Sequence, residues 1–486
     1  MKKKTFKDID VAGKKVFARV DFNVPTDENG KISDDTRIRA ALPTINYLVK
    51  QNAKVILCSH FGRPKGVFNE KYSLKVVAER LSELMNMTVK MAKDVIGPSA
   101  KSLIAEMKEG EIVLLENVRF HAEEELNDDK FAKELASLAD VYVNDAFGAA
   151  HRAHASTAGI AKYLPAVAGF LMDSEIMALS NAVENAEKPL VVILGGAKVS
   201  DKINVISKLM TQANTLLIGG AMANTFLAAK GYDIGFSKFE EDKIEVAKNI
   251  MEQADALNVN LVLPVDVVAG NEFAPKAKRK NFAANKIAGD YQAMDIGKKT
   301  CKLFAKEIQN AKTIIWNGPM GVFEFKKFRK GTLSVAKAVA KSGAVSIVGG
   351  GDSVAAVQEL GFANKVTHLS TGGGATLKFL EGATLPGVAM LEDKDSDKKK
   401  VKTPDFEAID KKTIEKPVVK AKTTAKKSAV KKESKPETAK TAETKAAATK
   451  KVPAKSNATK TVASKSTKTA TSKASAKAET KKTTKK

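Results

Sequence analysis

Short apolar runs alternate with longer amphipathic segments along residues 1–393 of this 486-residue chain. The apolar runs are mostly continuous, a pattern typical of strands that helices cover on both faces of a sheet. They are Val16–Val24, Lys54–Ser59, Ile112–Leu115, Val141–Asn144, Leu190–Leu194, Thr215–Ile218, Asn260–Val267, Thr313–Trp316 and Val345–Val348. The segments between them, such as Leu74–Asn86, Lys130–Ala139 and Ile203–Ala213, have helical periodicity. The sequence therefore predicts an α/β fold whose sheets are parallel and whose strands are joined by crossover helices.

The alternating pattern divides near the middle of the chain. Asp173–Ala186 is interpreted as a long polar helix, and Glu187-Lys188-Pro189 ends it. We expect an N-terminal domain over 1–172, an interdomain helix over 173–188 and a second α/β domain over 189–384.

Residues 394–486 differ in composition from everything before them. They contain 29 lysines, no arginine and 10 acidic residues, which supply +19 of the chain's formal charge of +25. Aromatic residues are nearly absent, so the segment can bury too little apolar surface to offset its ordering entropy. A disordered basic tail is predicted. Residues 1–393 carry the remaining formal charge of +6, which gives no reason to interpret them as a nucleic-acid-binding domain.

Other features of the composition favour a soluble cytoplasmic protein. No apolar run reaches the ~18 residues of a membrane span, and Thr5–Asp10 is not the apolar core of a signal peptide. Cys58 and Cys301 lack metal-type spacing and fit a reducing compartment.

Four apolar or strand-like runs in the second half end in glycine clusters: Leu194–Lys198, Ile218–Gly220, Val348–Asp352 and Thr371–Gly374. Ligands of open α/β sheets bind at the carboxyl ends of the strands, where glycine lets a ligand approach the backbone. A following helix offers free N–H groups to an anion. The clusters favour a phosphorylated ligand such as a nucleotide; the alternative is that these glycines only permit tight turns. Walker and dinucleotide fingerprints are absent, so the site must be of another kind.

Three charged side chains accompany the glycine clusters. Lys198 and Lys202 lie four residues apart at an expected helix start, where both could reach phosphates from one face. A solvated basic face is the alternative. Asp352 follows three glycines and precedes Ser353, a placement that suits a Mg²⁺ ligand or, alternatively, a helix N-cap.

The first half has arginine, histidine, asparagine and aspartate at its strand ends. These residues are Arg19, Asp21, Asn23, His60, Arg63, Asn117, Arg119, His151, Arg152 and His154, with Arg37 expected in a polar loop. Arginine matches carboxylate and phosphate oxygens in bidentate fashion, although a lone arginine is usually only solvated. Zinc-type histidine spacing is absent, so anion binding is favoured over metal binding. An anion-binding half facing a nucleotide-binding half indicates a kinase for a small anionic metabolite.

Seven motifs resemble those of the phosphoglycerate kinase family, in its order and at compatible spacing from about Thr5 to Leu391. They are Arg19–Pro25 (RVDFNVP), Ser59–Pro64 (SHFGRP), Glu116–Phe120 (ENVRF), Gly195–Lys202 (GGAKVSDK), Trp316–Glu324 (WNGPMGVFE), Gly350–Ser353 (GGDS) and Ser370–Ala375 (STGGGA). The resemblance implies two Rossmann-like domains around a hinged cleft, with segment 385–393 returning to the first domain. It also implies a monomer that transfers the acyl phosphate of 1,3-bisphosphoglycerate to ADP, reversibly and with Mg²⁺, giving 3-phosphoglycerate and ATP.

The resemblance also implies roles for individual residues. Asp21 and Asn23 would bind the glycerate end; His60, Arg63, Arg119 and Arg152 would hold the 3-phosphate. Arg37, Lys198 and the backbone of Gly372, Gly373 and Gly374 would act on the moving phosphoryl group. The nucleotide would be bound by Gly196, Ala197, Lys198, Lys202, Gly220, Asn317, Pro319, Glu324, Gly350, Gly351, Asp352 and Ser353, with Asp352 also holding Mg²⁺. Four positions depart from the commoner family pattern, namely Phe61, Ala149, Ala293 and Ser353.

The basic tail carries a second hypothesis. Lysines spaced every few residues could bind nucleic acid or another polyanion nonspecifically through counterion release. The alternative is a solvating appendage.

Overall fold

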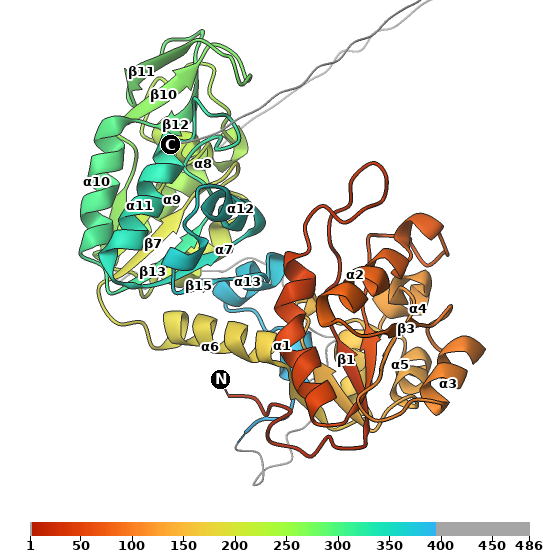
Figure 1. Ribbon diagram of the computed structural model, residues 1–486. Coiled ribbons are helices and arrows are strands. Elements are labelled where there is room, and N and C mark those ends of the chain that lie inside the picture. The colour runs from red at the N-terminus through yellow and green to blue at the C-terminus, as the bar shows by residue number, and fades with distance from the viewer. Residues whose placement is uncertain (1, 395–486) are drawn as a thin grey trace, which may run out of the picture. The chain divides into compact units, whose positions relative to one another are not determined.

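The computed structural model describes residues 2–394, which form two parallel sheets with helices around them and a third, smaller sheet (Figure 1). The disordered tail predicted for 394–486 lies outside the described residues, except for Lys394.

The first sheet has six strands in the order β3-β4-β2-β1-β5-β6, and every pair in it is parallel. Its strands are β1 (Lys15–Arg19), β2 (Lys54–Cys58), β3 (Val89–Met91), β4 (Ile112–Leu114), β5 (Val141–Asn144) and β6 (Ala166–Ala168). The helices of this part are α1 (Thr36–Lys50), α2 (Lys75–Met85), α3 (Pro98–Ala105), α4 (Ala122–Glu125) and α5 (Asp129–Ala136).

The second sheet is also six-stranded and parallel, in the order β15-β14-β13-β7-β8-β9. Its strands are β7 (Leu190–Leu194), β8 (Thr215–Ile218), β9 (Asn260–Val262), β13 (Thr313–Asn317), β14 (Val345–Gly349) and β15 (His368–Leu369). The later helices are α6 (Phe170–Glu184), α7 (Ile203–Met210), α8 (Met222–Ala229), α9 (Ile244–Ala256), α10 (Lys298–Gln309), α11 (Lys330–Ser342), α12 (Gly351–Glu359), α13 (Gly374–Leu380) and α14 (Pro386–Ala389).

Both faces of the parallel sheets are buried, which explains the continuous apolar runs. In β1, Phe17 packs in one hydrophobic cluster, whereas its neighbours Val16 and Ala18 pack in another on the opposite face. Successive side chains of a strand point to opposite faces, so a strand covered on both sides needs apolar residues at every position. The prediction of an α/β fold with parallel sheets is confirmed.

Two predicted strands were wrong in extent. The run Val16–Val24 leaves the sheet after Arg19, because Asp21 and Asn23 form loop hydrogen bonds and Phe22 N–H donates to Ser59 Oγ rather than to a strand. The run Asn260–Val267 is divided between β9 and β10, which lie in different sheets. Pro264 lies between these strands and cannot donate a ladder hydrogen bond.

The sequence did not predict the third sheet, which is antiparallel with the order β11-β10-β12. Its strands are β10 (Asp266–Gly270), β11 (Arg279–Ala283) and β12 (Gln292–Ile296). The polar composition of β11, which is largely exposed, gives no continuous apolar run to detect.

The helix between the two parallel sheets also differs from the prediction. It spans Phe170–Glu184 rather than 173–186, and it is not polar throughout, because Met172, Ile176 and Leu179 are buried. Glu175 is buried on the same helix.

Helix α14 and the residues after it lie beside the N-terminal residues and the first domain's loops. Lys3 Nζ donates to Leu391 O at 2.8 Å, and Gly387 N donates to Ala150 O at 2.9 Å. The domain limits themselves stay predictions.

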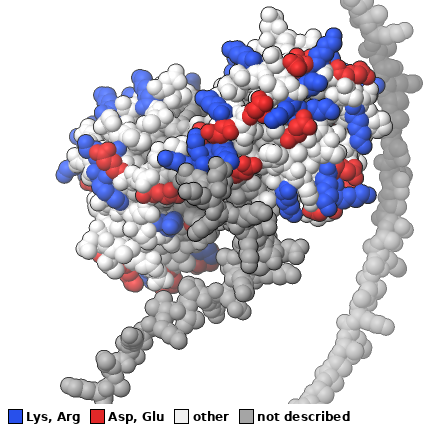
Figure 2. All heavy atoms as spheres, turned by 90° about the horizontal axis from the view of Figure 1, so that it is seen from below, with Lys and Arg blue, Asp and Glu red and all other residues white. Residues whose placement is uncertain are grey.

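Lys, Arg, Asp and Glu side chains are interspersed over the face displayed in Figure 2. This mixed surface agrees with the small net charge of the chain outside its tail.

Candidate active site

The carboxyl ends of the strands in the first sheet surround a cavity of about 310 Å³. Loops after β1, β2, β4 and β5 supply most of its wall, because the ends of parallel strands meet at one edge of a sheet. The cavity is lined by Asp21, Asn23, Arg37, His60, Gly62, Arg63, Arg119, Gly148, Ala149, His151, Arg152, Gly372, Gly373 and Gly374. The structure therefore brings together every substrate-binding residue predicted from the sequence. We call this cavity the anion pocket.

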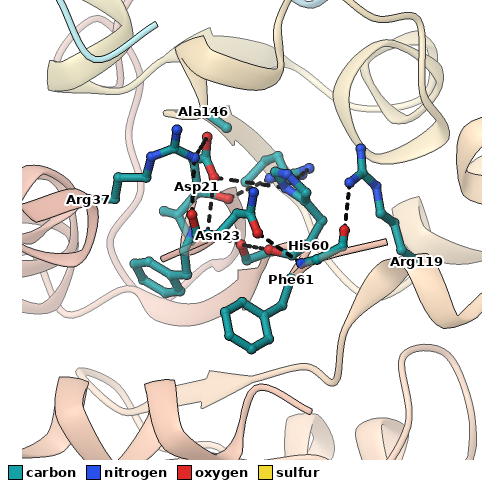
Figure 3. Close-up of polar contacts among 12 residues, drawn as sticks. Asp21, Asn23, Arg37, His60, Phe61, Arg119 and Ala146 are labelled. Carbon is teal, nitrogen blue, oxygen red and sulfur yellow. Dashed lines mark hydrogen bonds and ion pairs between the residues drawn. The ribbon is translucent and has the colours of Figure 1, made fainter. Parts of the chain in front are cut away.

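Arg37 is held in place on one side of the anion pocket. Its Nη1 lies 3.0 Å from Asp21 Oδ2 and donates to Asn23 O at 3.2 Å (Figure 3). Asn23 in turn accepts a hydrogen bond from Gly62 N at 2.8 Å. The expectation that Arg37 lies in a polar loop was wrong, since it lies in the first turn of α1. The helix gives its guanidinium a rigid base.

Arg119 approaches the pocket from the other side (Figure 3). Its Nη1 donates to Gly62 O at 2.9 Å, and its Nε lies 3.0 Å from Glu125 Oε1. Burial and the neighbouring arginines lower its pKa, which Glu125 partly offsets. Among the described residues, four arginines and one carboxylate line this pocket, so it favours a multiply charged anion.

Both histidines of the anion pocket are kept neutral. Burial, followed by the charges of Arg19, Arg119 and Arg37, holds the pKa of His60 well below its ordinary value. Burial and the charge of Arg152 lower the pKa of His151 to about 4. The charge of the pocket therefore comes from its arginines.

The loop before α13 brings Gly372, Gly373 and Gly374 to the same pocket. A Cβ at Gly372 would lie 2.5 Å from Phe147 and from Thr376 Oγ1, so only glycine fits there. Glu175 fixes this loop to α6: its carboxylate accepts from Thr371 N at 2.7 Å and from Thr371 Oγ1 at 3.0 Å. The backbone N–H groups of the loop are thus positioned by a buried carboxylate of another element.

A second cavity, of about 460 Å³, lies at the glycine-rich ends of the second sheet. We call it the nucleotide pocket, after the ligand that the sequence predicts for it. Of the predicted nucleotide residues, those that line it are Gly196, Ala197, Gly220, Pro319, Glu324 and Asp352. Gly220 has φ of +67°, and a Cβ there would lie 2.5 Å from Gly196 N. The glycines therefore allow tight turns as well as a backbone-lined cavity, and the phosphorylated ligand stays a prediction.

Six other predicted nucleotide residues do not line the cavity: Lys198, Lys202, Asn317, Gly350, Gly351 and Ser353. Several of them form hydrogen bonds next to the wall of the cavity. Lys202 Nζ donates to Asn317 Oδ1, Asn317 Nδ2 donates to Gly349 O at 2.9 Å, and Ser353 Oγ accepts from Gly318 N.

The two lysines do not share a helix face, contrary to the sequence interpretation. α7 begins only at Ile203, so Lys198 and Lys202 lie in the segment that connects β7 to α7. Lys198 is exposed, whereas Lys202 is buried, and burial lowers its pKa.

Asp352 is not the N-cap of its helix, so that alternative was wrong, and its role as a magnesium ligand stays a prediction. Gly350 is the N-cap of α12, and Asp352 lies in the first turn of the helix and lines the nucleotide pocket. Among residues 2–394, no three His, Cys, Asp or Glu side chains form a metal-binding group. Mg²⁺ bound with phosphates needs only one or two carboxylates, so this site fits Mg²⁺ and not an ion that requires a full protein cage.

Comparison with known proteins decides the family. The family model for phosphoglycerate kinase matches residues 6–383. The chain belongs to the phosphoglycerate kinase family. It is 53% identical over 394 residues to a phosphoglycerate kinase of Pelotomaculum thermopropionicum, covering 81% of this chain and 100% of that protein. It is 55% identical over 395 residues to one of Clostridium tetani, with coverages of 81% and 98%.

Solved structures of the family agree in fold. The phosphoglycerate kinase structure from Coxiella burnetii has a TM-score of 0.74 and 42% identity, covering 80% of this chain and 98% of that one. The structure from Pyrococcus horikoshii has a TM-score of 0.71 and 38% identity over the same shares. This phosphoglycerate kinase family member is a phosphotransferase that uses a carboxyl group as acceptor. Within the part of the chain that is described, no helix is long and apolar enough to cross a membrane.

Sequence reasoning about this kinase missed several residues of the nucleotide pocket. Asn224, Phe273, Met294 and Asp295 also line it. Phe273, Met294 and Asp295 belong to the antiparallel sheet or its connections, which no sequence pattern indicated. The departure noted at Ala293 falls in the same wall.

Asp295 is a buried carboxyl group in this wall. Its carboxyl accepts from Gly331 N at 2.7 Å and from Ile296 N at 3.0 Å, so it links β12 to the start of α11. Burial raises its pKa to about 8, which the backbone hydrogen bonds only partly offset.

Proposed function

We propose that the two pockets divide the family's reaction between them. The anion pocket takes 1,3-bisphosphoglycerate or 3-phosphoglycerate, and the nucleotide pocket takes ADP or ATP. The observation that carries this assignment is the convergence of four arginines on one cavity at the strand ends of the first sheet. A substrate with a carboxylate and a phosphate at opposite ends has the charge that such a cavity requires.

Within the anion pocket, Asp21 and Asn23 bind the glycerate hydroxyl and carboxyl end. His60, Arg63, Arg119 and Arg152 hold the 3-phosphate. Arg37 contacts the carboxyl-phosphate, and its position on α1 beside Asp21 supports this role, because a guanidinium fixed by a carboxylate needs little reorganisation during transfer.

Within the nucleotide pocket, Glu324 bonds the ribose, and Gly196, Ala197, Gly220 and Pro319 contact the nucleotide directly. Lys202, Asn317, Gly350, Gly351 and Ser353 support or contact the phosphates. Asp352 would hold Mg²⁺, which would neutralise charge on the nucleotide phosphates. Lys198, which is exposed in the segment before α7, reaches the moving phosphoryl group.

The chemistry needs alignment and electrostatic stabilisation more than bond-making by the protein. Phosphoryl transfer passes through a loose transition state whose charge is spread over the equatorial oxygens. Arg37, Lys198 and the N–H groups of Gly372–Gly374 surround that charge. No protein base is required, because the acceptor oxygens are already anionic. The substrates lie on separate domains, so we expect hinge closure to precede transfer and to exclude water.

A coupled assay tests the assignment by measuring ATP formation from 1,3-bisphosphoglycerate and ADP. In Arg63→Ala, we expect the KM for 3-phosphoglycerate in the reverse direction to rise about tenfold, as for loss of one charged hydrogen bond, with the KM for ATP unchanged. Arg39→Ala is the matched control, since Arg39 pairs with Asp35 outside the anion pocket. An unchanged KM in Arg63→Ala, or an equal change in Arg39→Ala, would contradict the assignment.

The proposal also includes a role in glycolysis, which is that of the family, and a monomeric, cytoplasmic state. The two cysteines, both without a disulfide, are consistent with a reducing compartment. Sedimentation of the purified chain tests the expected monomer.

The lysine-rich tail favours a second function, nonspecific binding of polyanions. Its 29 lysines, without arginine, suit contacts to phosphate backbones rather than bidentate base recognition. Retention on DNA should fall steeply with salt for the full chain and be lost for a chain that ends at Asp393. Equal retention of both chains would exclude the tail's role, and equal kinase activity of both is expected.

A further inference from the structure

Arg19 is a buried cation next to the anion pocket that does not line it. Its side chain, at the end of β1, is 1% exposed, and the cavity wall does not include it. The guanidinium donates to Ser156 Oγ at 2.9 Å and to Val20 O, and its Nη2 lies 3.2 Å from His60 Nδ1. Burying a charge is costly unless it is fully hydrogen-bonded, so this arrangement requires a reason beyond packing.

The contact with His60 fixes the proton of the imidazole. A guanidinium has five N–H donors and no acceptor, so His60 Nδ1 must accept this hydrogen bond. The carboxylate of Asp21 also faces Nδ1, but its Oδ1 is 3.9 Å away, beyond hydrogen-bond distance. His60 is neutral, because burial and the charges of nearby arginines lower its pKa. Its one proton is therefore on Nε2.

The protonated nitrogen is left for a ligand. Nε2 of His60 makes no hydrogen bond with any described residue, and it is not among the buried polar atoms that lack a partner. His60 lines the anion pocket. An N–H donor that is reachable and without a protein partner, in a cavity of arginines, suits the oxygen of an anion.

A second buried group keeps Arg19 in this position. Ser156 Oγ accepts from Arg19 and donates to Glu124 Oε1 at 2.6 Å, and Ser156 N donates to Glu124 Oε2 at 2.8 Å. Burial alone would raise the pKa of Glu124, but the His154 hydrogen bond and the Arg19 charge lower it overall. The chain of contacts Glu124–Ser156–Arg19–His60 thus runs from a buried carboxylate to the pocket wall.

We propose that Arg19 is a positioning residue that fixes the tautomer and ring orientation of His60, so that His60 donates its Nε2–H to the phosphate of the bound substrate. This proposal rests on the proposed function of the anion pocket. The dianionic phosphate that predominates above its second pKa of about 6 only accepts hydrogen bonds, and a histidine locked as a donor in this direction never presents it with a lone pair.

Nitrogen NMR of the wild-type protein tests the tautomer directly. The chain has five histidines, so ¹⁵N-histidine labelling with five single substitutions assigns every ring. We expect pyrrole-type Nε2 and pyridine-type Nδ1 signals for His60 in the free enzyme. The Nε2 signal should shift with 3-phosphoglycerate and not with glycerate, which lacks the phosphate. A protonated Nδ1, or an Nε2 signal that ignores 3-phosphoglycerate, would overturn the proposal.

Binding measurements test whether Arg19 acts through His60. By calorimetry, Arg19→Met should weaken 3-phosphoglycerate binding about tenfold, the scale of one hydrogen bond to a charged group, without affecting ADP. His60→Ala should weaken 3-phosphoglycerate binding by the same factor. The double variant should bind no more weakly than either single variant, because both substitutions remove the same contact. Tyr142→Phe is the matched control, since the buried Tyr142 hydroxyl donates to Ser156 O on the same network without contacting His60.

The possible outcomes separate this proposal from the function on which it rests. The positioning role of Arg19 would be overturned if the affinity losses of Arg19→Met and His60→Ala were additive, or if Tyr142→Phe lost as much affinity. In either case, binding of 3-phosphoglycerate by the wild-type protein would still support the pocket assignment. Failure of the wild-type protein to bind 3-phosphoglycerate would refute the assignment itself. If Arg19→Met does not fold, the wild-type NMR measurement decides alone.

Discussion

Glu175 offers a sharp test of how one buried carboxylate serves the active site from a distance. It lies on α6 with its side chain fully buried, and it accepts three contacts from the strand and loop that lead to Gly372–Gly374. His368 Nε2 lies 2.8 Å from Oε2, while the amide and hydroxyl of Thr371 donate to Oε1. Removing the carboxylate leaves buried donors without an acceptor.

The expected loss in the free energy of unfolding follows from these contacts. A buried polar group that loses its hydrogen-bond partner costs about 1–3 kcal/mol, and Glu175 accepts from both the amide and the hydroxyl of Thr371. We therefore expect Glu175→Ala to lower the free energy of unfolding by about 4 kcal/mol. Glu175→Gln keeps one carbonyl acceptor and should lose about half as much. Because Thr371 leads directly into the glycine loop, kcat should fall in the same order, by roughly tenfold or more in the alanine variant.

Urea unfolding curves give the stability loss, and the coupled assay at saturating substrates gives kcat. His368→Ala and the double variant complete a cycle in which the two losses should be strongly non-additive. The reasoning fails if Glu175→Ala unfolds at the wild-type urea midpoint, or if its kcat stays within a factor of two of the wild type.

Three further predictions concern the nucleotide side. Burial raises the pKa of Asp295 to about 8, so the folded protein retains a proton that the unfolded chain releases above about pH 4, and the stability from this group is lost as pH rises toward 8. The unfolding free energy of Asp295→Asn relative to wild type should therefore increase by about 1.4 kcal/mol per pH unit over that range; a flat difference would contradict the buried proton. Lys198→Ala should lower kcat by roughly 10²–10³ with an unchanged urea midpoint, since Lys198 is exposed, and near-normal turnover would exclude its role. Asp352→Asn should raise the Mg²⁺ concentration for half-maximal rate about tenfold or more, as expected when a metal loses its one carboxylate; the same half-maximal concentration as wild type would rule out Asp352 as the ligand.

Most of the predicted substrate residues could be found from sequence because they lie in the segments that follow parallel strands; Arg37, in the first turn of α1, is the exception. Strand ends share one edge of the sheet, so Asp21, His60 and Arg119 had to converge once the strands were identified. The nucleotide side was less predictable. The split of Asn260–Val267 between two sheets and the antiparallel sheet that follows depend on pairing partners distant in sequence, which periodicity cannot reveal.

The sequence by itself determined the α/β class, the two sets of strand ends and the family, because apolar runs and glycine clusters are local patterns. Only the tertiary structure decided which charged groups bind ligand and which position others. Arg19 and Arg119 look alike in sequence, yet one is enclosed against Ser156 and His60 while the other lines the pocket. Likewise, Glu175 in an apparently polar helix is a buried acceptor for Thr371. Burial and hydrogen-bond partners set the role of a charged side chain, and both come from contacts across the fold.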